Sequence, residues 1–442
     1  MRLMFQRLRG LNSKHKSLFL VVAVALLARL ATSLLHITHG IVPAPFVGPM
    51  PWADYNVYVA ELHFVAQGYL PYRDFGFNYM PLFLYALLPF YLLVGTYGPS
   101  IVIVVSDALT AGVIYLIVSR KQQTQLAFAA GLAYALLPFA LYNEGYLWLS
   151  SQPMTLFGIL SLYFLMEDRP YQSFGLLAVS VLFKQETVVL LPVFLFWEFR
   201  HGLSRAMKSL TIFITAVSAV SIPFLVLSAS NYLYAITYTL AKLGHLYPAV
   251  VAFPVGAASP SQSMLTCSNT TVPGLFTGQV CSNTNVLRMT WVVTEPLLNR
   301  VVASTEGLLA GLTPLFLLLL CVSLYSLRRS KNFPQLISAA SILVLLVAFG
   351  AAVHIVFAYY FLPVYALMFA ASTDYRTLGI AIVGALLPVL APEGPLQAFL
   401  PVSFLLLMAV ATDLTLSRQV VSSEAHSRPS SPVGLLRPQE SQ

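Results

Sequence analysis

Charged residues are scarce in this chain of 442 residues: Asp, Glu, Lys and Arg make up 9% of it, and apolar residues make up 58%. A soluble domain of ordinary composition carries about 25% charged residues. The scarcity excludes a soluble globular protein and indicates a polytopic membrane protein.

Sequence motifs of nucleotide, metal and hydrolase chemistry are also missing. The chain has no P-loop, no Gly-x-Gly-x-x-Gly, no Gly-x-Ser-x-Gly and no Cys-x-x-Cys, and its eight His are scattered. We therefore expect no metal and no cofactor. Nucleotide-driven transport and hydrolysis by a serine nucleophile lose support for the same reason.

Apolar runs of about 20 residues predict membrane-spanning helices. Long runs lie at 17–38, 100–118, 126–142, 207–228, 305–327 and 333–353, and shorter ones at 154–166, 172–183, 188–199, 356–372, 376–392 and 396–412. The predicted fold class is an all-α polytopic membrane protein, a bundle of about twelve transmembrane helices with external amphipathic loop helices. We expect this domain to cover residues 1–416 and a disordered cytoplasmic tail to cover 417–442.

The basic residues predict the orientation. Most of the 24 Lys and Arg fall on one side if these segments alternate, which places both termini in the cytoplasm. The loops 39–99 and 229–304 are then external, in a multi-pass protein of the cell membrane. The net charge of +8 is mostly this signal and needs no nucleic acid. The first segment follows a basic start but lacks an Ala-x-Ala cleavage pattern, so we expect an uncleaved span.

One apolar stretch, 79–95, does not fit the alternation as a crossing. It contains Pro81 and Pro89 and is barely long enough to span. A crossing there would move the later basic loops to the outside. We therefore expect it to dip into the membrane and return to the outer side.

Two cysteines bracket a polar stretch of the 229–304 loop. Cys267 and Cys281 would form a disulfide on the oxidising side, contributing about 3 kcal/mol by the chain-entropy estimate. The alternative is a pair of unlinked thiols, while Cys321 lies in an apolar run. Between the two, Asn269-Thr270-Thr271 is a glycosylation sequon, and because such short patterns occur by chance, its occupancy is open.

The most informative segment is the polar and aromatic insert at 51–90, which carries three carboxylates. Its first part, from Asp54 to Gly68, has the spacing of a short amphipathic helix on the outer face. Asp54 and Glu61 are seven residues apart and share a helix face. Asp54 has a structural alternative as the helix N-cap. Arg73 and Asp74 have one too, as an ion pair with each other.

These residues carry a resemblance to a known superfamily. Asp54-x-x-x-Tyr58, Gly68-x-x-Pro71-Tyr72-x-Asp74 and Phe77-x-Tyr79-x-Pro81-Leu82 resemble the first external loop of GT-C glycosyltransferases, especially prokaryotic polyprenol-phosphate-mannose-dependent enzymes. Three later stretches add to the likeness: WLSSQPMTL from Trp148, Phe183-Lys184-Gln185-Glu186, and HIVFAYYFLP from His354. Pro153 and Met80 depart from the usual pattern, which puts the exact donor in doubt more than the reaction.

The resemblance implies an inverting transfer of a hexose, mannose in the nearest relatives. The sugar would pass from a polyprenyl (dolichyl) phosphate to an extracytoplasmic glycolipid, glycan or protein. Asp54 would be the catalytic base, and Lys184 the cation near the phosphate, with a Lys184–Glu186 pair as the alternative. The other expected substrate-binding residues are Arg73, Glu61, Asp74, Tyr58, Gln152 and His354. Glu144 could also bind sugar or phosphate from an outer helix end.

Two other classes compete with a glycosyltransferase. A transporter or lipid flippase would use the intramembrane charges Arg29, Asp107, Lys184 and Glu186 as a path. Against it, the two halves show no repeat and the polar groups gather on one side. Arg29 and Asp107 also suit a structural pair across the bundle. A noncatalytic scaffold would leave the carboxylate-rich insert unexplained.

Overall fold

The computed structural model of the chain describes residues 13–39, 51–75, 77, 79–120, 124–149, 151–241, 265–272, 276–283, 289–293, 314–315, 317–322, 324–325 and 362–390. His354, the predicted segments 333–353 and 396–412, and the tail 417–442 lie outside these residues.

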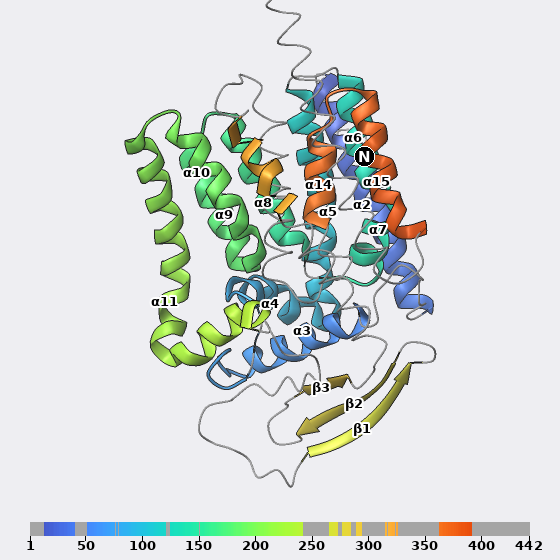
Figure 1. The fold of residues 1–442 in the computed structure, drawn as a ribbon. Coiled ribbons are helices and arrows are strands. Elements are labelled where there is room, and N and C mark those ends of the chain that lie inside the picture. The colour runs from blue at the N-terminus through green and yellow to red at the C-terminus, as the bar shows by residue number, and fades with distance from the viewer. Residues whose placement is uncertain are drawn as a thin grey trace, which may run out of the picture.

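Helices make up the body of the molecule (Figure 1). They are α2 (Ser13–His39), α3 (Pro51–Ala66), α4 (Leu82–Val94), α5 (Gly98–Ser119), α6 (Thr124–Ala135), α7 (Pro138–Ala140), α8 (Ser151–Met166), α9 (Pro170–Phe183), α10 (Leu191–Phe199), α11 (Leu203–Ala241), α14 (Leu362–Ala370) and α15 (Tyr375–Leu390), with short turns η1 (Gly95–Tyr97), η2 (Leu141–Tyr146) and η3 (Gln185–Leu190). The predicted helical membrane class is confirmed.

Four stretches of the described residues are long and apolar enough to cross a membrane: Lys14–Thr38, Leu82–Ser119, Thr124–Tyr146 and Leu203–Ala229. Helices α8 and α9 are apolar but shorter. The total of about twelve crossings stays a prediction.

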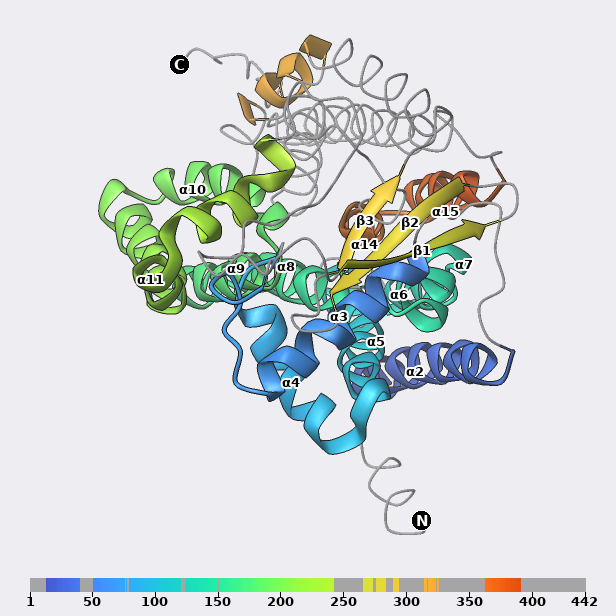
Figure 2. The ribbon, with the colours of Figure 1, turned by 90° about the horizontal axis from the view of Figure 1, so that it is seen from below.

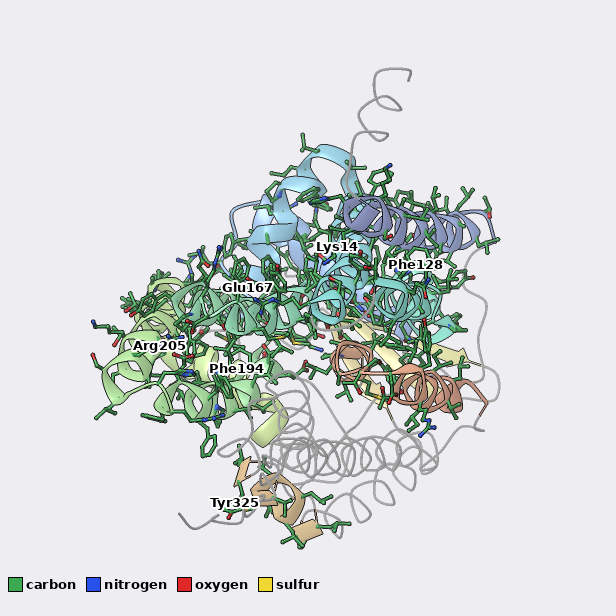
Figure 3. The ribbon with its side chains drawn as sticks, turned by 90° about the horizontal axis from the view of Figure 1, so that it is seen from above. Lys14, Phe128, Glu167, Phe194, Arg205 and Tyr325 are labelled. Carbon is green, nitrogen blue, oxygen red and sulfur yellow. The ribbon has the colours of Figure 1, made fainter. Side chains whose placement is uncertain are left out.

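The helices alternate in direction as predicted, because contacts gather their expected cytoplasmic ends at one end of the bundle. Tyr115 near the end of α5 donates to the Lys14 carbonyl at the start of α2, at 3.0 Å. Arg120 pairs with Glu167 at 2.5 Å, and Arg205 pairs with Asp168. Figure 3 looks onto this end, with Lys14, Glu167 and Arg205 labelled. Which side of the membrane it faces stays a prediction.

Helices α3 and α4 lie at the opposite end, the lower one in Figure 1. Figure 2 shows α3 lying across the bundle at this end. Tyr55, Tyr58 and Leu62 share one buried face of α3, as an amphipathic helix requires. The predicted stop is confirmed, since α3 ends at Ala66 and Gly68 has a φ of +89°.

The start of α3 corrects the sequence reading. The helix begins at Pro51, so Asp54 lies inside the first turn and is not the N-cap. Proline suits the first helical position because its φ is preset and its missing N–H is not needed there.

Helix α4 reverses sharply into α5. It has 13 residues, about 20 Å of helix, which is less than the roughly 30 Å of a bilayer core. A Cβ on Gly98 would lie 1.9 Å from the Phe90 carbonyl oxygen, so the turn requires glycine. The short length and the reversal support a dipping segment at 79–95, which stays a prediction.

The 229–304 loop contains structure that we did not predict. Strands β1 (Leu265–Val272), β2 (Phe276–Asn283) and β3 (Met289–Val293) form an antiparallel sheet in the order β1-β2-β3. Cys267 is opposite Cys281, and Asn269 is opposite Gln279. Only the backbone is described here, so the disulfide and the glycosylation of Asn269 stay predictions.

Helix α11 extends past the predicted end at residue 228. Its path breaks at Ser228, where φ and ψ are −160° and 64°. There the Ser228 hydroxyl donates to the Tyr72 carbonyl at 3.2 Å. Helix α11 is thus held at Ser228 to the turn that follows α3.

Candidate active site

The expected base, Asp54, belongs to α3, at the end of the bundle where α3 and α4 lie. Asp54 is in the first turn of this helix, and the structure describes its backbone only. A carboxylate in the first turn is stabilised by the helix dipole. This position suits a group that has to accept a proton.

A chain of contacts links α3 to the expected cation. The hydroxyls of Tyr58 and Tyr79 lie 3.0 Å apart. The Lys184 ammonium lies over the Tyr79 ring, 5.3 Å from its centroid. The structure therefore brings together Tyr58 and Lys184, two of the predicted site residues, with Tyr79 between them.

Lys184 owes its place to a break between two helices. It follows Phe183, the last residue of α9, and adopts an extended conformation with φ of −155° and ψ of 129° before η3 begins. Lys184 is only 2% exposed. The ammonium lies 3.1 Å from Glu186 Oε1, so the pair that was the structural alternative exists. This pair supplies the countercharge that a buried lysine needs.

Arg73 and Asp74 occupy an exposed turn and bind each other. Arg73 donates to both oxygens of Asp74 at 2.8 Å, and the Leu70 amide donates to Asp74 at 2.8 Å. The hydrogen bonds from Arg73 hold the pKa of Asp74 below its usual range. This is the structural alternative for both residues. The pair is too exposed to contribute much to stability.

Glu61 lies one helical turn beyond Tyr58 on α3 and is half-buried. Its charge acts on Tyr72, in the turn that follows the helix. Tyr72 has a φ of +66°, unusual for a bulky residue and typical of loops held by tertiary contacts. Glu61 is therefore close enough to the turn that follows α3 to act electrostatically on it.

Gln152 belongs to a buried polar network inside the bundle. Its amide nitrogen donates to the Tyr134 hydroxyl at 3.3 Å, and Tyr134 donates to Asp107 at 2.8 Å. Asp107 forms a fully buried ion pair with Arg29. The predicted structural pair across the bundle is confirmed. This ion pair also occupies Arg29 and Asp107, two of the charges that a transporter would use as a path.

Glu144 lies in the same region, and the sequence indicated it, with Gln152 and His354, as a residue that could bind sugar or phosphate. It is on η2, a π-helix of six residues, and is completely buried. π-Helices are rare and are frequent at functional sites. Sequence reasoning had one signal for it, an acidic residue at the end of an apolar run.

Trp148 connects this region with α3. Its indole N–H donates to Ser33 Oγ at 2.9 Å, and its ring lies 4.9 Å from that of Tyr55, the residue after Asp54. Trp148 has a φ of +55°, which costs about 1–3 kcal/mol of backbone strain. The strain is tolerated where tertiary contacts fix the position of the side chain, as they do here.

The sequence matches no known protein family and no curated protein. Among solved structures, the chain is similar to an archaeal oligosaccharyltransferase, AglB from Archaeoglobus fulgidus, determined with an inhibitory peptide and a dolichol-phosphate. The identity is 15% and the TM-score 0.41, over 89% of this chain and 54% of that one. The chain thus spans about half the length of this neighbour. A likeness at this level says nothing about chemistry, and the expected activity rests on the residues described above.

Proposed function

We propose that this protein is an integral membrane glycosyltransferase that moves a hexose from a polyprenyl phosphate to an acceptor hydroxyl. The observation that carries the proposal is the contact chain from α3, which bears Asp54, through Tyr58 and Tyr79 to Lys184. It places a carboxylate-bearing helix and a buried cation at the same end of the bundle. These are the two charges that the reaction needs.

Asp54 accepts the proton of the acceptor hydroxyl as that oxygen attacks the anomeric carbon of the sugar. A new carbon–oxygen bond forms, and the bond between the anomeric carbon and the phosphate oxygen breaks. The electron pair leaves with the polyprenyl phosphate. Because attack comes from the side opposite the phosphate, the anomeric configuration inverts.

Lys184 stabilises the negative charge that develops on the leaving phosphate. A preorganised cation in a site that excludes water interacts with such charge far more strongly than in solution. Lys184 is held by Glu186 and the Tyr79 ring before the donor arrives. The phosphate would then take the place of Glu186 as the partner of the ammonium.

The location of these groups supports a lipid-linked donor and an acceptor outside the cytoplasm. A polyprenyl chain occupies the bilayer beside the bundle, and its phosphate lies at the membrane surface where α3 and α4 lie. Mannose is the proposed hexose, and a glycolipid, glycan or protein outside the cytoplasm is the proposed acceptor. Tyr58, Glu61 and Gln152 are proposed to contact these substrates, as is His354; the Arg73–Asp74 turn would contact the acceptor.

The test is a transfer assay with purified protein in detergent. Radiolabelled mannose and glucose are supplied on a polyprenyl phosphate, together with membrane lipid extract as a source of acceptors. Label should move to a product that lacks the polyprenyl phosphate, and Asp54→Asn should lower this transfer by roughly 100-fold or more. If neither donor supports transfer by folded wild-type protein, the proposal is wrong and the transporter hypothesis moves ahead.

A further inference from the structure

Glu144 is a buried carboxylate whose hydrogen-bonding capacity is unused. Neither of its oxygens has a hydrogen-bond partner within the described residues, and the residue is 0% exposed. Buried polar groups in native proteins are normally hydrogen-bonded, and each exception needs an explanation. An uncompensated carboxylate inside a protein costs several kcal/mol.

The charged side chains near Glu144 are paired with other residues. Arg29, Asp107 and Lys184 are all close enough to act electrostatically on Glu144. Arg29 is paired with Asp107, and Lys184 is paired with Glu186. Among the described residues, Glu144 therefore belongs to no ion pair, although Arg29 and Lys184 act on it electrostatically.

Two side chains of the buried network of Arg29, Asp107, Tyr134 and Gln152 also have unused hydrogen-bonding capacity. Arg29 Nη2, a donor, and Gln152 Oε1, an acceptor, are buried without a hydrogen-bond partner in the described part of the chain. The side chain of Gln152 is fixed by Tyr134, which is bound to the partner of Arg29. The backbone of η2 lies directly against Arg29, since a Cβ on Gly145 would lie 3.3 Å from the Arg29 Cα.

These unused groups define the chemistry of the missing partner. A metal cation would satisfy Glu144 but would be repelled by the Arg29 guanidinium. A phosphate would satisfy Arg29 but would be repelled by the Glu144 carboxylate. A hydroxyl group both donates and accepts, so it satisfies a carboxylate, an amide oxygen and a guanidinium nitrogen together. A neutral partner with hydroxyl groups, such as a sugar ring or water, therefore fits these three groups.

We infer that Glu144, with Gln152 and Arg29, binds the hydroxyls of the sugar on the lipid phosphate donor. This inference rests on the proposed function. Glu144 follows Asn143 and precedes the Gly145 to Trp148 stretch that contacts α3 through Tyr55. The sugar would reach into the bundle at η2 while its phosphate stays at Lys184.

The experiment compares two lipids that differ only by the sugar. Dolichyl phosphate and dolichyl-phosphate mannose are titrated separately into purified protein in detergent, and the dissociation constant of each is measured. Wild type should bind the mannose-carrying lipid more tightly. Glu144→Met should lose this preference by about 10-fold or more while binding dolichyl phosphate as wild type does, because hydrogen bonds to charged groups are the strong ones. Lys184→Met should weaken the binding of both lipids.

Two further variants keep the test decisive. Glu144→Gln keeps the shape of the side chain and should lose part of the preference, even if Glu144→Met does not fold. Glu198→Gln is the matched control, because Glu198 is also completely buried but is paired with Arg205 at the other end of the bundle. It should keep the full preference.

The outcomes distinguish a failure of the sugar site at Glu144 from a failure of the proposed function. If folded Glu144→Gln and Glu144→Met retain the wild-type preference for mannose, only water occupies the site and the inference is wrong. Equal binding of the two lipids by wild type would overturn it as well. If wild type binds neither lipid and transfers no sugar, the proposed function fails first.

Discussion

The hydroxyls of Tyr58 and Tyr79 lie 3.0 Å apart. This contact joins the helix that carries Asp54 to the ring that the Lys184 ammonium faces at 5.3 Å. The expected base and the expected cation are thus parts of one connected arrangement, although they come from distant stretches of the chain. Each has its own test.

Asp54→Asn should lower turnover by roughly 100-fold or more. Asparagine has nearly the same size and does not accept the proton, so expression and melting temperature should stay close to wild type. The initial rate of sugar transfer is the measurement. Glu61→Gln, on the same helix face, removes a carboxylate that is proposed to bind substrate and not to accept the proton, so its effect should fall on the KM and leave most of the turnover. Near-normal transfer by folded Asp54→Asn would place the base at Glu61 or Asp74.

Lys184→Met should raise the KM for the donor by about 10- to 100-fold, because it removes a charge-assisted contact to phosphate. Glu186→Gln is the informative comparison, since it removes the partner seen at 3.1 Å but keeps the ammonium. Its KM should stay near or below the wild-type value. A purely structural pair predicts instead that both variants lose stability equally and that neither changes the KM.

Part of the fold could be predicted because local patterns determine it. Helix α9 was expected at 172–183 and spans Pro170–Phe183, since an apolar run between a proline and a lysine leaves little choice. Helix α5 was expected at 100–118 and spans Gly98–Ser119. The sheet in the 229–304 loop was missed because its polar strands lack the usual alternation of apolar residues.

The arrangement of the site was beyond sequence reasoning. Asp54, Tyr58 and Lys184 could be chosen from their chemistry and from a family resemblance. That Tyr79 lies between Tyr58 and Lys184 depends on how α9 packs beside the first external loop, which no local pattern contains. Glu144 could be named from its acidic side chain near an outer helix end, but its complete burial and its unpartnered oxygens appear only in three dimensions.

Gly145→Ala should destabilise the protein by about 1–3 kcal/mol through overpacking. A Cβ there would lie 2.1 Å from Thr32 Oγ1. Adding Thr32→Ala removes the nearest clash and should restore part of the loss. Thermal unfolding in detergent measures both. Gly379→Ala in α15, where a Cβ meets nothing within 4 Å, should be neutral or stabilising. Equal melting temperatures for the two single variants would contradict this packing.

Cys267 and Cys281 should be linked in the mature protein. Directly opposed residues of antiparallel strands have Cα atoms about 4.5–5.5 Å apart, which lies within the usual range for a disulfide of about 4.4–6.8 Å. Their pairing in the β1–β2 register meets this condition. Mass spectrometry of non-reduced peptides, with thiols alkylated before lysis, is the measurement. Quantitative recovery of both as alkylated thiols would refute the link.

Single cysteines test the predicted orientation. Gln122→Cys and Asn332→Cys are each introduced into a cysteine-free variant of the protein. In intact cells, these cysteines should not react with a membrane-impermeant thiol reagent, because they lie in basic loops expected in the cytoplasm. Gln262→Cys in the 229–304 loop should react. Labelling at Gln122→Cys would mean that 79–95 crosses the membrane after all.

The π-helix at Leu141–Tyr146 makes the site depend on a residue count as well as on residue identity. Each residue of an α-helix turns the chain by about 100°, and a π-turn accommodates one residue more than an α-turn. Deleting one residue from η2 would let it close as an ordinary α-helix. Trp148 would then be rotated about the helix axis relative to the apolar run that precedes η2. Glu144 would then be carried to another face of the bundle with no change in chemistry. The position of Glu144 in this site therefore depends on the number of residues in η2 as well as on the identity of its side chains.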